Sequence, residues 1–324
     1  MEAFSDSNEL YTIRNQFYTY QHNKVKSYSL DEFSEENQLK VLEIQIRSTI
    51  ALGQDASKLI EDGKIRFPDN EELFQLLQAW NDLKDFGTDD STYFEDLKAA
   101  KFELQAILTS LYLKKFEKDI DQSIKFLTNY IDNVSSLQKY NEIEVFLILM
   151  QLYLLKGDFK EATAVFRNLN SFPDFAKDEI IYQMIESWYG IIKGGAENIS
   201  NAYDFYDEIL NTGYNEGDVK GKIRILNTQL VLTLQLDHIP EAQELLKQIQ
   251  SLSKEIPDDE AKDLSGDILA NEIALDRLTN QGKNSKSLLE QLKKANPEHE
   301  LLKDEQQKNE LFDSLVAKYK SVET

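Results

Sequence analysis

The sequence contains no cysteine, and its 324 residues include only three histidines, 12 glycines and 5 prolines. Without cysteine the chain has no disulfides, no thiolate metal ligands and no cysteine nucleophile. A protein of strands and tight turns needs glycine or proline about every dozen residues. Their scarcity, beside abundant Leu, Glu, Lys, Gln and Ala, therefore predicts an almost entirely helical chain.

Long apolar runs are also missing. The longest covers residues 145–155 and is interrupted by Gln151, which is too short to cross a hydrocarbon core of about 30 Å. We interpret it as a buried helix. The first residues show no basic segment followed by an apolar core, so we expect no secretory signal and a cytosolic location.

Positive charge is in short supply. The chain has 36 Lys and Arg against 58 Asp and Glu, which gives a formal net charge of −22. Such a field repels phosphate backbones and anionic lipid headgroups, so we expect no nucleic-acid partner and no direct membrane insertion. A solvated acidic surface explains this charge most simply, and a dedicated site for basic ligands is the other interpretation.

The sequence does contain a repeat. Five positions with offsets of 3, 6, 7 and 10 recur in three copies that begin at Phe159, Ile199 and Ile239, 40 residues apart. These offsets place five side chains on one helical stripe, and the period is typical of stacked helical repeats. The second position is Ala in all three copies, as in the second helix of the tetratricopeptide repeat, where two helices approach closely. A fourth copy begins at Ile120, with Ser123 as the small residue.

This register predicts an all-α fold, a curved α-solenoid of tetratricopeptide-like helical pairs with atypical terminal repeats. We expect one domain over residues 1–324, with divergent helical pairs in 1–114, clearer repeats in 115–295 and a C-terminal capping helix in 296–324. The copy over residues 143–173 is the best, with a turn at Gly157-Asp158 and a stop at Pro173.

Local signals set the expected helix boundaries. Helices are expected over 8–18, 35–52 with Ser34 as its cap, 55–61 with an end at Gly63, 71–84, 266–278 and 285–295. Thr92 and Glu95 fit a capping box, which predicts a long helix from there to Lys114. A polar connector is expected over 253–263.

No catalytic, cofactor-binding or metal-binding residues are expected. His22, His238 and His299 lie far apart, and no phosphate-binding loop is present. Acidic pairs such as Asp89-Asp90 fall at helix starts and connectors, where carboxylates stabilise exposed amides. A helical hydrolase or transferase with a cleft between repeats is the alternative from another class, but the sequence offers no triad or metal set for it.

A binding surface is therefore the predicted functional feature. The first helices of stacked pairs line a concave groove that can hold a segment of a partner. Packing between repeats is the other interpretation for the apolar members of this set. The expected groove residues are Leu147, Gln151, Leu154, Trp188, Tyr189, Asn227, Val231 and Leu234.

Three collinear segments carry a resemblance to a known family. They are Asn8-Glu9-Leu10-Tyr11 with Asn15-Gln16-Phe17-Tyr18, then Ser187-Trp188-Tyr189 with Gly194-Gly195-Ala196-Glu197 and Asn201-Ala202-Tyr203-Asp204-Phe205, and finally residues 289–292, His299 and residues 309–319. Together they resemble the epsilon subunit of the coatomer (COPI) vesicle coat, of the fungal type.

The resemblance implies a non-catalytic coat subunit on the cytosolic face of Golgi membranes and coated vesicles. Its implied role is in Golgi-to-ER retrograde and intra-Golgi transport, and its implied partner is the C-terminal region of the coatomer alpha subunit, around which the family's repeats curl. The alternative is a tetratricopeptide adaptor for a different protein or peptide. A clamp for peptide carboxylates needs several cations along the groove, and Arg224 and Lys193 are few and scattered.

Overall fold

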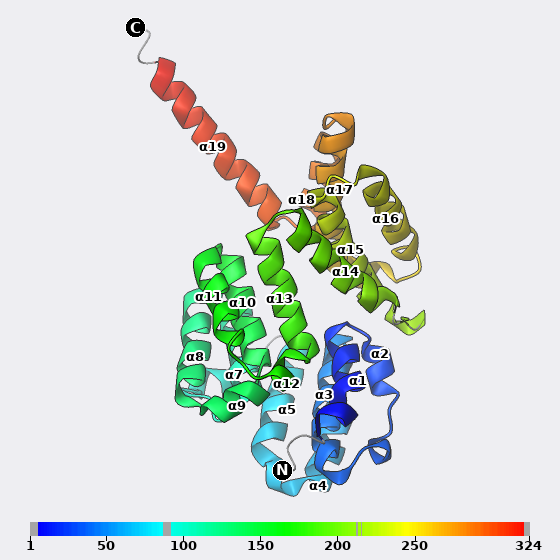
Figure 1. Cartoon of the computed structure of the whole chain (residues 1–324), viewed down its shortest axis with the longest axis vertical. Helices are drawn as coiled ribbons and strands as arrows, with labels where there is room; N and C mark the ends of the chain where they lie inside the picture. The colour runs from blue at the N-terminus through cyan, green and yellow to red at the C-terminus, as the bar shows by residue number, and fades with distance from the viewer. Residues whose placement is uncertain (1–5, 87–91, 212, 215, 321–324) are drawn as a thin grey trace. The chain divides into compact units, whose positions relative to one another are not determined.

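The computed structural model describes residues 6–86, 92–211, 213–214 and 216–320, and it divides into two compact units. Unit 1 comprises residues 1–205 and 215–218, and unit 2 comprises residues 206–214 and 219–324. The boundary falls within helix α14 (Ala196–Asn211). Every regular element in the described ranges is a helix (Figure 1), which confirms the all-α prediction.

Unit 1 is built from helices that pack mainly against their neighbours in the chain, as tetratricopeptide-like pairs do. The best-defined pairs are α7 with α8 and α10 with α11, and α13 packs against α10 and α11. The elements are α1 (Asp6–Tyr18), α2 (His22–Lys26), η1 (Leu30–Glu32), α3 (Glu35–Ala51), α4 (Ser57–Arg66), η2 (Pro68–Asn70), α5 (Glu71–Phe86), α6 (Tyr93–Asp96), α7 (Glu103–Lys115), α8 (Ile120–Asn133), α9 (Ser136–Asn141), α10 (Glu144–Lys156), α11 (Phe159–Leu169), α12 (Asp174–Lys177), α13 (Ile180–Lys193) and η3 (Glu216–Asp218).

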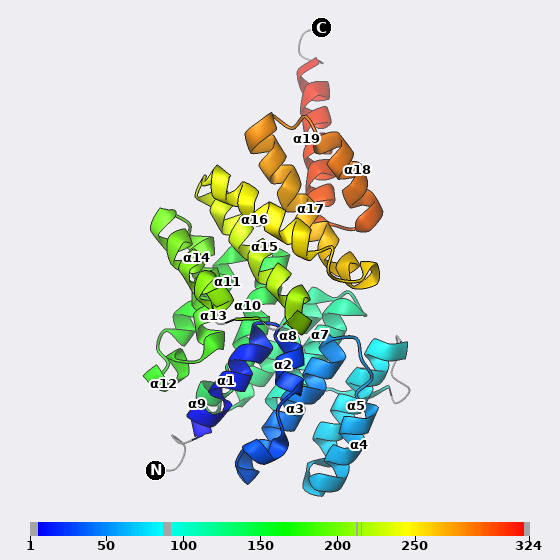
Figure 2. The ribbon, with the colours of Figure 1, turned by 90° about the vertical axis from the view of Figure 1, so that its right-hand side faces the viewer.

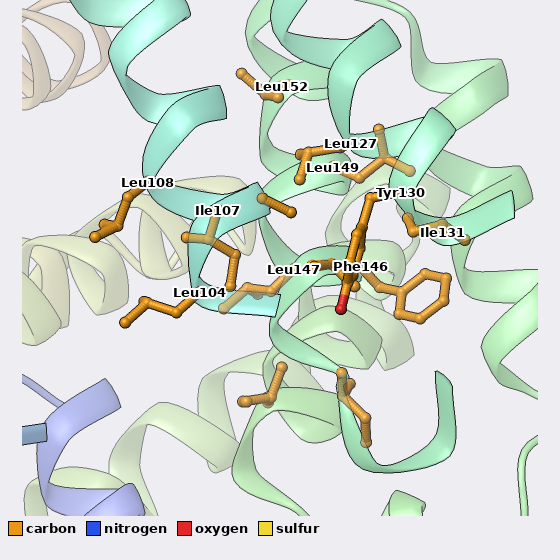
Figure 3. Close-up of a cluster of buried hydrophobic side chains, with 14 of the residues drawn as sticks. Leu104, Ile107, Leu108, Leu127, Tyr130, Ile131, Phe146, Leu147, Leu149 and Leu152 are labelled. Atoms are coloured by element: carbon orange, nitrogen blue, oxygen red, sulfur yellow. The ribbon is translucent and has the colours of Figure 1, made fainter. Parts of the chain in front are cut away.

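The core of unit 1 forms where these pairs stack. Figure 3 shows Leu104 and Ile107 of α7, Leu127 of α8, and Leu147 and Leu149 of α10 converging on one apolar interior. All five side chains are buried, so each helix contributes a stripe that no single pair could bury alone.

Small side chains lie where the pairs approach most closely, as the repeat predicts. Ser123 of α8 is fully buried, and its hydroxyl lies 2.7 Å from the hydroxyl of Ser110 on α7. Ala162 of α11 is likewise fully buried. The first position of the pattern behaves differently, because Phe159 is 58% exposed although the stripe predicts it in the core.

The N-terminal helices contact segments that are distant in the sequence. Figure 2 shows α1 and α2 beside α3, with α4 and α5 next along. Arg14 of α1 forms a 3.0 Å ion pair with Glu179, which precedes α13. The backbone N–H of Asn23 in α2 donates to Asp218 in η3 at 2.9 Å. These polar contacts fasten both ends of the α1–α2 segment to later parts of unit 1.

Several expected boundaries need correction. Residues 92–114 do not form one helix: α6 ends at Asp96, Leu97 is extended, and α7 begins at Glu103. Thr92 has φ +52° and its side chain makes no capping hydrogen bond. Ser34 does precede α3, but its hydroxyl donates to Glu9 at 2.6 Å and does not cap the helix.

Two more helices extend beyond their expected ends. Helix α4 continues through Gly63 to Arg66, and Gly63 packs against the Phe74 ring, where a Cβ would lie 2.4 Å from a ring carbon. In unit 2, α17 begins at Asp258, so the chain after Pro257 starts a helix where a connector was expected. Proline before an acidic first turn is a helix start.

Unit 2 continues with pairs of helices. Helix α15 (Val219–Gln235) packs against α16 (Ile239–Leu252) and α17 (Asp258–Asn280), and α17 packs against α18 (Ser285–Ala295). Helix α19 (Glu300–Lys320) lies in the segment for which a capping helix was expected. Its Leu301 and Leu302 pack against Leu288 and Leu292 of α18, and the rest of α19 extends away from α17 and α18 (Figure 1).

Candidate functional site

An apolar pocket of about 660 Å³ opens on unit 1 between α10, α11 and α13. Helices α10 and α13 are the first helices of successive pairs, so the pocket lies on the face where a partner-binding groove was expected. Its lining residues are Gln151, Leu154, Leu155, Phe159, Trp188, Ile191 and Ile192.

The turn between α10 and α11 shapes this pocket. Gly157 ends α10 with φ +76°, a left-handed conformation that suits glycine. The Asp158 carboxylate then accepts the N–H of Glu161 and caps α11. This tight reversal places Phe159 at the start of α11 in the same lining as Leu155 at the end of α10.

Two lining side chains are strongly exposed. Leu155 and Phe159 leave 54% and 58% of their surface open, while Trp188 and Leu154 are half-buried and pack against the core. Exposed apolar side chains around a hollow with an aromatic wall are typical of a surface that anchors a partner.

The eight expected groove residues divide into three sets. Gln151, Leu154 and Trp188 line the pocket. Leu147 is buried, and the Tyr189 ring stacks on Phe166 with centroids 4.3 Å apart, so both pack inside unit 1.

The other three groove residues lie on α15 of unit 2. Asn227 accepts a 2.8 Å hydrogen bond from Asn271 of α17, Leu234 packs against the core of unit 2, and Val231 is half-buried. The set as a whole remains a prediction of the partner surface.

Sequence reasoning missed four lining residues: Leu155, Phe159, Ile191 and Ile192. Helix periodicity contained part of the signal, because Leu155 follows Gln151 by four residues and Ile191 and Ile192 follow Trp188 by three and four. Phe159 carried no such signal, since its repeat position indicates a buried side chain.

A buried ion pair holds the base of α10. The Arg47 guanidinium of α3 binds Glu144 through both terminal nitrogens, with one contact of 3.0 Å. Its Nη1 also contacts Glu43 at 3.3 Å, and it lies 4.6 Å over the Phe17 ring of α1. Burial, the largest single influence, would raise the pKa of Glu144, but the charge and hydrogen bonds of Arg47 act together with the Lys40 charge and a Tyr18 hydrogen bond to lower it.

Glu103 of α7 joins this cluster with a different protonation. Its carboxyl accepts the backbone N–H of Glu144 at 2.9 Å and so caps α10. Burial, followed by the charge of Glu144, raises the pKa of Glu103 to about 8. Near neutral pH this group therefore keeps its proton, and the cluster serves to join α1, α3, α7 and α10.

Each of the three histidines lies beside a different polar group. His22 lies 3.2 Å from the Ser48 hydroxyl, His238 contacts Glu241 at 3.1 Å, and His299 contacts Asp267 at 3.1 Å. Within the described ranges no group of three or more His, Cys, Asp or Glu side chains is placed to hold a metal ion. No described helix is long and apolar enough to cross a membrane.

Unit 2 has a second, polar pocket of about 370 Å³ between α16, α17 and α18. Asp276 lies in its wall, and the Asp276 carboxylate accepts hydrogen bonds from the Asn284 backbone at 2.9 Å and from the Ser285 hydroxyl at 3.0 Å. These bonds hold the turn between α17 and α18, so this acid has a structural role.

Stacked helical pairs define the class of the protein, an α-helical repeat protein. A sequence profile described as coatomer epsilon subunit matches residues 124–320. The chain belongs to this family, whose members are subunits of the COPI vesicle coat, and this confirms the resemblance.

Two fungal relatives agree with the family match. The chain is 26% identical over 301 residues to a coatomer subunit epsilon of Saccharomyces cerevisiae, covering 90% of this chain and 92% of the relative. It is 23% identical over 219 residues to a probable coatomer subunit epsilon of Schizosaccharomyces pombe, covering 66% and 67% of the two chains.

Proposed function

We propose that this coat subunit is a non-catalytic scaffold that binds the C-terminal region of the coatomer alpha subunit through the pocket between α10, α11 and α13. The observation that carries the proposal is the exposure of Leu155 and Phe159 beside Trp188 in one apolar hollow. Burying such side chains against a partner removes apolar surface from water at about 25 cal/mol per Å².

In this proposal the subunit acts on the cytosolic face of Golgi membranes, in Golgi-to-ER retrograde and intra-Golgi transport. The net charge of −22 supports recruitment by protein partners, because anionic headgroups repel an acidic surface.

The test is binding of the isolated alpha C-terminal domain to the full-length chain. Leu155→Asp combined with Phe159→Asp is expected to raise the Kd at least tenfold, since each change puts a charge in the pocket. An anchor residue typically contributes about 2 kcal/mol or more. Both side chains are exposed, so the melting temperature and helix content should stay unchanged.

The matched control is Leu137→Asp, which changes a 69% exposed leucine on α9 outside the pocket lining. Equal binding by the control and the pocket variant would show that the pocket is not the alpha-binding surface. Val231→Asp on α15 tests in the same binding assay whether the predicted groove residues of unit 2 contact the alpha domain.

A tetratricopeptide adaptor for a different protein or peptide is the second candidate. It predicts no affinity for the alpha domain and a peptide ligand in the same pocket. A folded chain that fails to bind the alpha domain at micromolar concentration, yet selects one sequence from a peptide array, would favour this candidate.

A further inference from the structure

The pocket between α10, α11 and α13 contains one amide side chain. Among the described residues that line it, Gln151 alone carries an amide, and the others are Leu, Ile, Phe and Trp. None of these lining side chains is charged. Gln151 is exposed, so a polar group faces solvent from within an apolar hollow.

The Gln151 side chain has no hydrogen-bond partner in the part of the chain that the structure describes. On a helix surface, a side chain meets the residues three and four positions away. For Gln151 these neighbours are all apolar, namely Leu147, Ile148, Leu154 and Leu155. The amide therefore depends on water in the free protein.

A partner that fills the hollow removes this water. An amide that is buried without a hydrogen bond destabilises the complex, so Gln151 favours a partner that offers it a donor or an acceptor. The partner group must be uncharged, because the lining has no charged side chain to compensate an ion that loses its hydration.

The backbone of the partner is the source of such a group. Side chains that fit walls of Leu, Ile, Phe and Trp are themselves apolar. The polar atoms that an apolar segment still carries are those of its peptide groups. A glutamine amide matches a peptide group, because it both donates through its NH2 and accepts through its carbonyl oxygen.

We propose that Gln151 is a specificity-determining residue of this pocket, which hydrogen-bonds a backbone peptide group of the coatomer alpha segment whose apolar side chains fill the hollow. The identity of the partner rests on the proposed function. Gln151 then discriminates against segments that fill the same hollow but leave the amide unpaired or place a charge beside it.

The first test is binding of the isolated alpha C-terminal domain to full-length Gln151→Leu. We expect the Kd to rise at least fivefold, because a peptide group of the partner is left unpaired. If the amide only lost water on binding, its removal would lower the Kd. Gln151 is exposed, so the melting temperature should match that of the wild type.

The matched control is Gln122→Leu, which changes an exposed glutamine on α8 outside the pocket lining. This variant should bind with the Kd of the wild type. An unchanged or lower Kd for Gln151→Leu would overturn the proposal.

The second test, Gln151→Glu, asks whether the partner group is uncharged. At pH 8 the variant should have a Kd at least ten times that of the wild type, because a carboxylate cannot donate and brings a charge into the hollow. At pH 5 this ratio should be at least three times smaller, since apolar surroundings favour the protonated acid, which is neutral and can donate. Tighter binding than the wild type at pH 8 would indicate a cationic partner group, and a ratio independent of pH would equally contradict the proposal.

Failure of this inference is distinguishable from failure of the proposed function. If Leu155→Asp with Phe159→Asp weakens binding while Gln151→Leu does not, the pocket binds the alpha domain without help from Gln151. If the pocket variant binds as well as Leu137→Asp, the alpha domain binds elsewhere, and both proposals are wrong.

Discussion

Glu103 is a carboxylic acid placed beside other acids. Glu43 and Glu144 lie in the same cluster, and Arg47 and the half-exposed Lys40 are its cations. Burial, followed by the charge of Glu144, raises the pKa of Glu103, so Glu103 retains a proton while its carboxyl oxygen accepts the N–H of Glu144. Glu103 therefore accepts a backbone N–H at the start of α10 without adding a third negative charge beside Glu43 and Glu144.

This arrangement predicts a pH-dependent stability. The pKa of Glu103 is about 8 in the folded protein against an ordinary value of 4.5. Between these values the folded state binds more protons than the unfolded state, so stability falls as pH rises, by at most about 1.4 kcal/mol per pH unit. Glu103→Gln keeps the acceptor and removes the charge. It should match the wild type at pH 5 and exceed its stability at pH 8 in urea unfolding.

The control for this prediction is Glu61→Gln, an exposed acid on α4 whose removal should leave the pH profile unchanged. Parallel profiles for the wild type and Glu103→Gln would contradict the assigned protonation of Glu103.

Helix α4 shows how a single glycine determines the packing of an element. A Cβ on Gly63 would lie 2.4 Å and 2.7 Å from ring carbons of Phe74, and 2.9 Å from a Leu42 methyl. Phe74 is almost completely buried. The glycine is there because α4, α3 and α5 approach one another closely.

Gly63→Ala should therefore destabilise the protein, although alanine is the better helix former by about 1 kcal/mol. We expect a loss of about 1 to 3 kcal/mol from overpacking, measured by urea unfolding. Gly190→Ala in α13 is the control: its Cβ would be 3.4 Å from the nearest atom, so its effect should be neutral or stabilising. A stabilised Gly63→Ala variant would refute the close packing.

Elements with a local or periodic cause were predictable from the sequence. The repeat register identified Ser123 as the close approach of α7 and α8, and Gly157 marked the end of α10. The pocket was predicted in part for the same reason: Gln151, Leu154 and Trp188 follow from helix periodicity, whereas Phe159 depends on how α10, α11 and α13 meet.

The region around Thr92 shows why other elements could not be predicted. Phe94 stacks on Tyr112 with ring centroids 5.1 Å apart, yet in one continuous helix these residues would lie about 27 Å apart. The chain must therefore reverse between α6 and α7. Tertiary packing of aromatic rings overrides the local capping signal, and no pattern within residues 92–95 contains that information.

At the scale of the molecule, unit 1 depends on contacts between its beginning and its end. Asp218 is almost completely buried and accepts the backbone N–H and the side-chain amide of Asn23, at 2.9 and 3.2 Å. The Asn23 side chain also donates to the Gly217 carbonyl.

Asp218→Ala should leave these donors unpaired and cost about 1 to 3 kcal/mol. We expect faster amide hydrogen exchange at residues 22–26 and a lower stability of unit 1. Asp218→Asn keeps one acceptor oxygen and should show a smaller change, while Asp237→Ala, at an exposed turn, should show none. Unchanged exchange in Asp218→Ala would mean that α2 is held by its apolar contacts alone.

The contact between Asn23 and Asp218 can form only late during synthesis of the chain. Asn23 and Asp218 are 195 residues apart, and ribosomes add about 5 to 20 residues per second. Asp218 is therefore synthesised about 10 to 40 s after Asn23, its hydrogen-bond partner in α2. During that interval the apolar side of α1 and the hydrogen-bond donors of α2 lack their native contacts with later residues. We expect factors that bind nascent chains to cover them.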